Sequence, residues 1–302
     1  MGFERTVHTS EKGMRLDRFL RIHAPRAPAA AALLKQGRLT VDGRKARATD
    51  VLAPGQVVRL TEPAPRRPAG GGEGRATPLS EVERELLARI TLFEDDDLIV
   101  FDKPSGLAVH KGTRTSEDLD TILAKCIDAE GERPRLVHRL DKDTSGLLVA
   151  AKHKRFAEDL GRAFAGRTVA KTYLAVVAGV PTPRAGRIET ALKKVETSRG
   201  GRMVAAAAGD PQALAAATAF EVVEIAADGR SSLVAFSPET GRQHQLRVHA
   251  ELLGHPILGD RLYGDARASP RLMLHAHRLR LPDGRGGTRE FVAPLPDGFE
   301  RG

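Results

Sequence analysis

Tryptophan is absent from this chain of 302 residues, and aromatic residues make up only 4% of it. A surface that stacks successive nucleic-acid bases on aromatic rings is therefore not expected as the main binding device. Cys126 is the single cysteine, which excludes an intramolecular disulfide and any cysteine-based zinc site. Because Cys126 lies in an apolar run, we expect it to be a buried small side chain and not a nucleophile.

Long apolar runs are also missing. No stretch reaches the roughly 18 apolar residues that a membrane-spanning helix requires, and the N-terminus lacks an apolar signal core. The glycine patterns of dinucleotide-binding and phosphate-binding loops are absent, as is the serine nucleophile elbow. We therefore expect a cytoplasmic protein with no membrane contact, and the composition, 41% hydrophobic and 29% charged, is that of a globular chain.

Positive charge is in excess. Lysine and arginine number 48 against 39 aspartate and glutamate, a net charge of +9. An excess of this size makes a polyanionic partner plausible, although solubility alone could explain it.

Proline and glycine divide the chain. A run rich in both lies between about residues 61 and 79 and has nothing to bury, which is typical of a linker. We predict a small domain over residues 1–61, a linker over 62–82 and a larger domain over 83–302. The pattern shows no internal repeat.

The small domain is predicted to contain two helices and a short sheet. Apolar residues at helical spacing begin at Leu16, and an alanine-rich helix is expected over residues 28–36. The Asp42-Gly43 pair predicts a turn between strands at 38–41 and 56–60. Phosphate binding is favoured over a merely solvated face for its basic residues, which include Arg18, Arg26, Lys35, Arg38 and Arg44.

The large domain mixes strands with helices. Apolar or alternating runs predict strands at residues 98–101, 146–151, 168–177, 219–224 and 232–236. Helical patterns fit residues 116–127, 155–165 and 241–253. Several strands follow one another directly, which favours an α+β fold with an antiparallel or mixed sheet.

Residues 138–146 form a dense polar cluster just before a predicted buried strand. Here Asp141 stands between Arg139 and Lys142, and such cations keep a carboxylate ionised. An ionised, partly desolvated carboxylate can act as nucleophile or base. A solvated connecting loop is the alternative that these residues alone leave open.

A second cluster covers residues 240–249. On a helix beginning near Gly241, Gln243 and Arg247 would share a face, with Leu246 pointing inward and Arg247 free to pair with a buried carboxylate. A plain surface helix is the alternative. The spacing of His244, His249 and His255 favours structural or RNA-contacting roles over a metal site.

The sequence Arg139-Leu140-Asp141-Lys142-Asp143-Thr144-Ser145-Gly146-Leu147 strongly resembles the signature of RluA-type pseudouridine synthases. Further stretches resemble that family in the same order, at residues 103–110, 171–173, 241–249, 254–260, 263–264 and 274–276. The likeness spans residues 89–295. Residues 14–60 resemble the alpha-L RNA-binding domain that many members carry in front.

The resemblance implies an isomerase that converts uridine to pseudouridine within RNA, without cofactor or metal. It implies that Asp141 is the essential carboxylate, that Tyr173 packs against the target base, and that Arg247 pairs with Asp141. Arg139 would take the place of the flipped uridine in the RNA helix. With Arg139, further RNA contacts are expected from Lys142, Arg242 and His244.

The substrate implied is large-subunit ribosomal RNA, with transfer RNA as the alternative, because the larger domain is most similar to the RluC subgroup and then to RluD. A monomer is expected. Two other classes stay open: a non-catalytic RNA-binding protein that keeps the fold, and a glycosidase using the paired carboxylates of Asp141 and Asp143.

Overall fold

A computed structural model describes residues 3–24, 39–47, 49–60, 78–110, 118–197, 200–283 and 286–299. The chain divides into two compact units, Met1–Arg75 and Ala76–Gly302. The predicted domain boundaries stay predictions, because residues 61–77 lie outside the described ranges. Glu81 and Val82, which were placed in the predicted linker, begin helix α3 (Glu81–Ile90).

The first unit has a four-stranded antiparallel sheet in the order β1-β4-β2-β3. Its elements are β1 (Phe3–Thr6), the 3-10 helix η1 (Thr9–Glu11), α1 (Leu16–His23), β2 (Leu39–Val41), β3 (Arg44–Lys45) and β4 (Val57–Leu60). Leu16, Phe19 and Leu20 of α1 pack with the inward residues of β2 and β4 to form its core. The predicted second helix at residues 28–36 lies outside the described residues.

The turn between β2 and β3 shows how local sequence sets this small sheet. Asp42 and Gly43 both have positive φ, 51° and 74°. A two-residue hairpin turn of this type needs left-handed backbone at both positions, which Asp and Gly adopt most readily. The predicted turn is thus confirmed, whereas β1 was not predicted.

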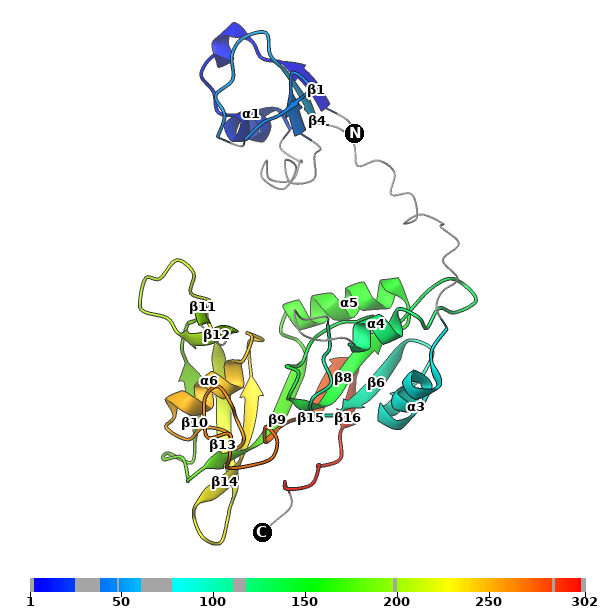
Figure 1. Ribbon diagram of the computed structural model, residues 1–302, viewed down its shortest axis with the longest axis vertical. Helices are drawn as coiled ribbons and strands as arrows, with labels where there is room; N and C mark the ends of the chain where they lie inside the picture. The colour runs from blue at the N-terminus through cyan, green and yellow to red at the C-terminus, as the bar shows by residue number, and fades with distance from the viewer. Residues whose placement is uncertain are drawn as a thin grey trace. The chain divides into compact units, whose positions relative to one another are not determined.

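The second unit contains a ten-stranded mixed sheet in the order β10-β13-β14-β9-β15-β8-β6-β5, with β16 paired to β15 and β7 paired to β8 (Figure 1). Its strands are β5 (Thr91–Glu94), β6 (Leu98–Lys103), β7 (Arg135–Leu136), β8 (Ser145–Ala151), β9 (Ala170–Ala178), β10 (Ala185–Glu189), β13 (Ala217–Ile225), β14 (Ser231–Pro238), β15 (Leu274–Pro282) and β16 (Thr288–Val292). The pairs between described strands are antiparallel except β15 with β8. The predicted α+β class with a mixed sheet is confirmed.

Helices cover this sheet unevenly. Helices α4 (Leu119–Leu123) and α5 (Lys154–Ala165) lie over β6 and β8, while α6 (Gln245–Leu252) lies near β13 and the hairpin of β11 (Leu192–Thr197) and β12 (Gly200–Ala205) (Figure 1). Every residue of β8 is buried, as its apolar run predicted. Two apolar clusters result, one around β6, β8 and α5, and one around β9, β14 and α6.

Two predicted helices are shorter than expected. Helix α4 ends at Leu123, so the predicted continuation to Ile127 is wrong, and residues 116–117 lie outside the described part. Helix α6 begins at Gln245 and not near Gly241. Cys126 is partly buried against the first apolar cluster, with its thiol 3.7 Å from the Ile122 carbonyl oxygen, and burial raises the pKa of that thiol. A structural role for Cys126 agrees with these contacts.

Candidate active site

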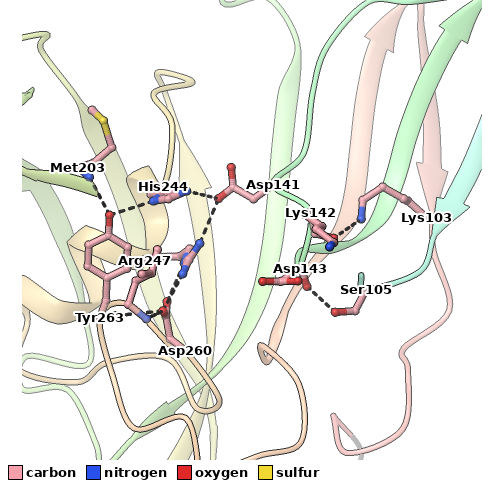
Figure 2. A network of polar contacts seen from close by, with 11 residues as sticks. Lys103, Ser105, Asp141, Lys142, Asp143, Met203, His244, Arg247, Asp260 and Tyr263 are labelled. Carbon is pink, nitrogen blue, oxygen red and sulfur yellow. Dashed lines mark hydrogen bonds and ion pairs between the residues drawn. The ribbon is translucent and has the colours of Figure 1, made fainter. Parts of the chain in front are cut away.

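Asp141 lies in the loop between β7 and β8, and a buried lysine holds this loop in place. Lys103 at the end of β6 is fully buried, and its Nζ donates hydrogen bonds of 2.9 Å to the carbonyl oxygens of Pro104, Leu107 and Lys142. Ser105 adds a hydrogen bond from its hydroxyl to the Asp143 carbonyl oxygen (Figure 2). The backbone that directly follows Asp141 is therefore fixed by the fold.

The two carboxylate oxygens of Asp141 have different surroundings. Oδ2 lies 3.7 Å from Arg247 Nη1 and 3.9 Å from His244 Nε2. Among the residues described, none makes a hydrogen bond or ion pair with Oδ1, and the side chain is 18% exposed. Figure 2 shows both contacts reaching the same oxygen while the other points away from them. One oxygen is thus held electrostatically and the other is open.

Arg247 is buried, and its principal partner is a residue that the sequence did not identify. Its Nε and Nη2 donate two hydrogen bonds of 2.7 Å to Asp260, which is 1% exposed. Asp260 also accepts the backbone N–H groups of Leu262 and Tyr263. Burial alone raises the pKa of Asp260, but these hydrogen bonds and the Arg247 charge hold it below its ordinary value.

The implied Asp141–Arg247 pair is therefore present only as the longer arm of a triad. A guanidinium that is already bound on one edge by Asp260 offers its remaining Nη1 to Asp141. Asp260 falls in one of the stretches that resemble the family, at residues 254–260, but no charge pattern along the sequence pointed to it. Only the fold brings residues 247 and 260 together.

The start of α6 differs from the prediction. Residue His244 precedes α6 and has left-handed backbone, with φ 52° and ψ 16°. Gln245 is buried, and its amide bonds Thr240, Arg242 and the end of β13. Gln243 thus lies before the helix, and the predicted shared face with Arg247 is wrong.

Tyr173 on β9 is half-buried and lines the same hollow as Asp141 and Leu246, which has a cavity volume of about 90 Å³. Burial and the nearby Asp141 charge raise the pKa of Tyr173, so it remains a neutral phenol near neutral pH. Larger hollows of about 410 and 390 Å³ adjoin on either side and share Arg139 with it. The three hollows together form one polar groove.

The structure brings together seven of the predicted site residues along this groove, namely Arg139, Asp141, Lys142, Tyr173, Arg242, His244 and Arg247. Arg18 and Arg44 are exposed in the first unit, and Arg26, Lys35 and Arg38 lie outside the described residues. His249 and His255 bond Thr218 and the Ala178 carbonyl oxygen. Within the described ranges, no group of three or more His, Cys, Asp or Glu side chains is arranged to hold a metal ion.

The model of the RNA pseudouridylate synthase family matches residues 97–252, just over half of the chain. An uncharacterized RNA pseudouridine synthase of Zymomonas mobilis is 39% identical over 217 residues, which cover 71% of this chain and 97% of that protein. The dual-specificity RNA pseudouridine synthase RluA of Escherichia coli K12 is 41% identical over 209 residues, or 68% of this chain and 92% of that protein.

Two further comparisons extend the likeness. The ribosomal large subunit pseudouridine synthase C of Escherichia coli O157:H7 is 34% identical over 310 residues, covering 98% of this chain and 93% of that protein. Among solved structures, human RNA pseudouridylate synthase domain containing 4 superposes with a TM-score of 0.60 at 30% identity, covering 72% of this chain and 93% of its own.

These matches define the class of protein: the chain belongs to the RNA pseudouridylate synthase family, as an RluA-type member. It is an isomerase that converts uridine to pseudouridine in RNA. Membership of this family excludes the two alternatives that the sequence left open, a glycosidase and a non-catalytic RNA-binding protein. None of the helices in the described ranges is long and apolar enough to cross a membrane.

Proposed function

We propose that Asp141 is the essential carboxylate of the isomerisation and that its Oδ1 is the reacting oxygen. The observation that carries this proposal is the asymmetry of the carboxylate. Arg247 and His244 both lie toward Oδ2, while Oδ1 has no partner among the described residues. With Oδ2 facing these two side chains, Oδ1 keeps its lone pairs available for the substrate.

The reaction leaves the atoms of the nucleoside unchanged in number. The N1–C1′ bond of uridine breaks, C5–C1′ forms, a proton leaves C5 and a proton is gained at N1. A carboxylate can serve this sequence by attack on the ribose, by proton abstraction or by addition to the base. Tyr173, held as a neutral phenol against the same hollow, supplies a flat apolar ring for the uracil face.

The proposed substrate is large-subunit ribosomal RNA, because relatives covering most of this chain are named ribosomal large subunit pseudouridine synthases. Transfer RNA is the second candidate. Enzymes that do chemistry on a base take it out of the stack, so we propose that the target uridine flips out of its helix to reach the Asp141 hollow. Arg139 is exposed beside the hollow and is placed to fill the vacated position with its planar guanidinium.

Further RNA contacts are assigned to Lys142 and Arg242, which line the groove in the second unit, and to Arg18 and Arg44 in the first unit. The excess of basic residues supports this assignment, since phosphate contacts dominate the affinity of proteins for nucleic acids. We further propose that the enzyme acts as a cytoplasmic monomer and that its first unit is an alpha-L RNA-binding domain.

The test uses ribosomal RNA transcripts that carry tritium at C5 of uridine. Isomerisation replaces the C5–H bond by C5–C1′, so each turnover releases tritium to water. We expect wild type to release it from large-subunit transcripts, and Asp141→Asn to be slower by about a thousandfold or more. Retained activity in Asp141→Asn would contradict the role of this carboxylate, and release only from transfer RNA would correct the substrate.

A further inference from the structure

One of the hollows beside the active site has no assigned occupant. It has a volume of about 390 Å³ and shares Arg139, Lys171 and Tyr173 with the Asp141 hollow. Its other side is formed by the end of α5 and by Arg167, and we call it the Lys171 hollow. A ligand in it would lie next to a nucleotide bound at Asp141.

The Lys171 hollow carries an excess of positive charge. Its lining includes the basic residues Arg139, Arg167, Lys171 and Arg242, against the single carboxylate of Glu239. Glu239 is already neutralised, because Arg187 donates hydrogen bonds of 2.7 and 2.8 Å to its two oxygens. His138 lies in the wall, where its Nε2 accepts the backbone N–H of Val149 and burial lowers its pKa to about 3, so it adds no charge near neutral pH.

Lys171 is the residue that points most directly to an anion. It lies on β9 two residues before Tyr173 and is half-buried. Its ammonium makes no hydrogen bond or ion pair with any residue in the described ranges, and burial lowers its pKa. Partial burial of an ammonium costs free energy that a counter-charge offsets. The missing partner is therefore expected to come from a ligand.

We propose that the Lys171 hollow binds a backbone phosphate of the RNA next to the target uridine, with Lys171 and Arg167 supplying the charge. The inference rests on the proposed function, because it places the flipped nucleotide at Asp141. A nucleotide whose base enters the Asp141 hollow carries a phosphate on either side. The neighbouring hollow shares the wall residues Lys171 and Tyr173 with it and is lined by cations.

The test measures binding as a function of salt. Full-length protein carrying Asp141→Asn is titrated into a fluorescent RNA hairpin with an oligouridine loop over a series of potassium chloride concentrations. Each phosphate contact contributes about 0.7 to 0.9 to the slope of log affinity against log salt. Lys171→Met is expected to reduce the slope by about that amount and to weaken binding about tenfold at low salt, whereas Lys171→Arg keeps most of the slope.

Lys152→Met is the matched control, because Lys152 pairs with Glu94 and lines none of the three hollows of the groove. It should leave the slope unchanged. Weaker binding by Lys171→Met with an unchanged slope would show a merely structural lysine and overturn the proposal, as would an unchanged affinity. Tritium release by wild type is scored separately, so a failure of the proposed function and a failure of the phosphate site give different results.

A second inference rests on a different observation, the contacts of the His244 ring with Tyr263 and Asp141. Tyr263 Oη accepts the backbone N–H of Met203 at 2.9 Å and lies 2.9 Å from His244 Nδ1 (Figure 2). Among the described residues the phenolic hydrogen has no other acceptor than Nδ1. The ring therefore carries its hydrogen on Nε2, the atom that lies 3.9 Å from Asp141 Oδ2.

The backbone supports a fixed role for this ring. His244 has left-handed backbone immediately before α6, a conformation that is costly for a residue with a side chain and that persists at functional sites. Burial lowers the pKa of His244, although the Asp141 charge opposes this effect. A neutral ring with its N–H toward Asp141 results.

The geometry points to His244 as a positioning residue that, with Arg247, holds Oδ2 of Asp141 and leaves Oδ1 to react. Tyr263 selects the tautomer that allows this. RNA contact by His244, expected from the sequence, stays a prediction beside this role.

A double-mutant cycle in kcat and KM tests the second inference. Tyr263→Phe and His244→Ala should each lower kcat about tenfold with little change in the KM for RNA, and His244→Gln should recover part of the loss because its amide keeps an N–H donor. In the His244→Ala background, Tyr263→Phe should lower kcat no further. Additive losses in kcat, or losses confined to KM, would overturn the role, and melting temperatures of all variants identify any that fail to fold.

Discussion

Two ionised side chains, Arg247 and Asp260, are buried in direct contact beside Asp141. Arg247 is 5% exposed and Asp260 is 1% exposed. Two charges so far from water contribute little net stability as a pair, but either one alone is costly because it has no counter-charge. The main effect of the pair is therefore to orient the Arg247 guanidinium so that its Nη1 faces Asp141.

Asp260→Asn is expected to lower the free energy of unfolding by about 3 to 5 kcal/mol, because it leaves the Arg247 charge buried without its partner. Urea unfolding measures this loss. Glu94→Gln serves as the control, since it breaks the more exposed Lys152–Glu94 pair and should cost about 1 kcal/mol or less. Equal losses for the two variants would contradict the account of the triad.

Stability should also fall as the pH is lowered through the range where free histidine titrates. His249 and His275 are fully buried, and burial lowers the pKa of each to about 4. Between about pH 6.5 and 4 the unfolded chain binds protons that the folded chain does not, so each histidine reduces the free energy of unfolding by up to about 1.4 kcal/mol per pH unit.

Urea unfolding at pH 7 and pH 5 measures this effect. The difference between the two pH values should shrink in His249→Gln, which removes one of the buried histidines whose pKa is lowered. If the variant keeps the whole difference, this histidine is not the source of the pH dependence.

At the scale of elements, β8 is the strand on which the site is built. It follows the Asp141 loop and pairs on one side with β6 and on the other with β15. Gly146 has φ 104°, and a Cβ there would stand 2.3 Å from the Ala276 carbonyl oxygen of β15. The close approach of the two backbones therefore requires glycine at this position.

Gly146→Ala is expected to lower the free energy of unfolding by about 3 kcal/mol or more and to reduce activity, because β15 must move away and the Asp141 loop with it. Gly161→Ala is the matched control. Gly161 lies within α5 with nothing within 4 Å of the added Cβ, so this change should raise stability by about 0.5 to 1 kcal/mol. Thermal unfolding and tritium release report the two effects, and a harmless Gly146→Ala would contradict the packing argument.

The strands that were predicted from sequence are those in which the apolar residues within the strand itself form a continuous or alternating run. Runs such as residues 146–151 and 168–177 show burial or alternation directly, and β8 and β9 lie there. The insertion of β15 between β8 and β9 was not predictable, because it pairs residues about 130 positions apart, such as Ser145 and His275. Strand pairing at such separation depends on the whole fold and leaves no local pattern.

The residues of the site also fall into two groups, those that the sequence identified and those that only the folded structure reveals. Asp141 stands out in the sequence as a carboxylate between cations, and Arg247 as a cation free to pair with a buried carboxylate. The resemblance added Tyr173 and the pairing of Arg247 with Asp141. Asp260 and the tautomer of His244 were not predictable, since both depend on contacts that form only when the chain is folded. The start of α6 was misplaced because the left-handed backbone at His244 interrupts an otherwise helical pattern.

At the scale of the whole molecule, the chain has two units with separate cores and an overall charge of +9. The hollows of the proposed isomerisation site are lined by described residues of the second unit, between Ala108 and Leu274. The first unit can therefore contribute to affinity for RNA without contributing to the chemistry.

Charge reversal in the first unit tests this division. The full-length variant with Arg18→Glu and Arg44→Glu should raise the KM for RNA several-fold and reduce the salt slope by about 1 for each lost contact, with kcat unchanged. Both side chains are exposed, so folding should be unaffected. A lower kcat at saturating RNA would show that the first unit takes part in the reaction itself.

The central claim is that Asp141 drives isomerisation of particular uridines in ribosomal RNA, and mapping of pseudouridines tests it most directly. A carbodiimide-stop readout across ribosomal and transfer RNA would compare a strain that lacks this gene with strains carrying wild type or Asp141→Ala. The account predicts large-subunit sites that vanish in the deletion, return with wild type and stay absent with Asp141→Ala. Restoration of those sites by Asp141→Ala would contradict it.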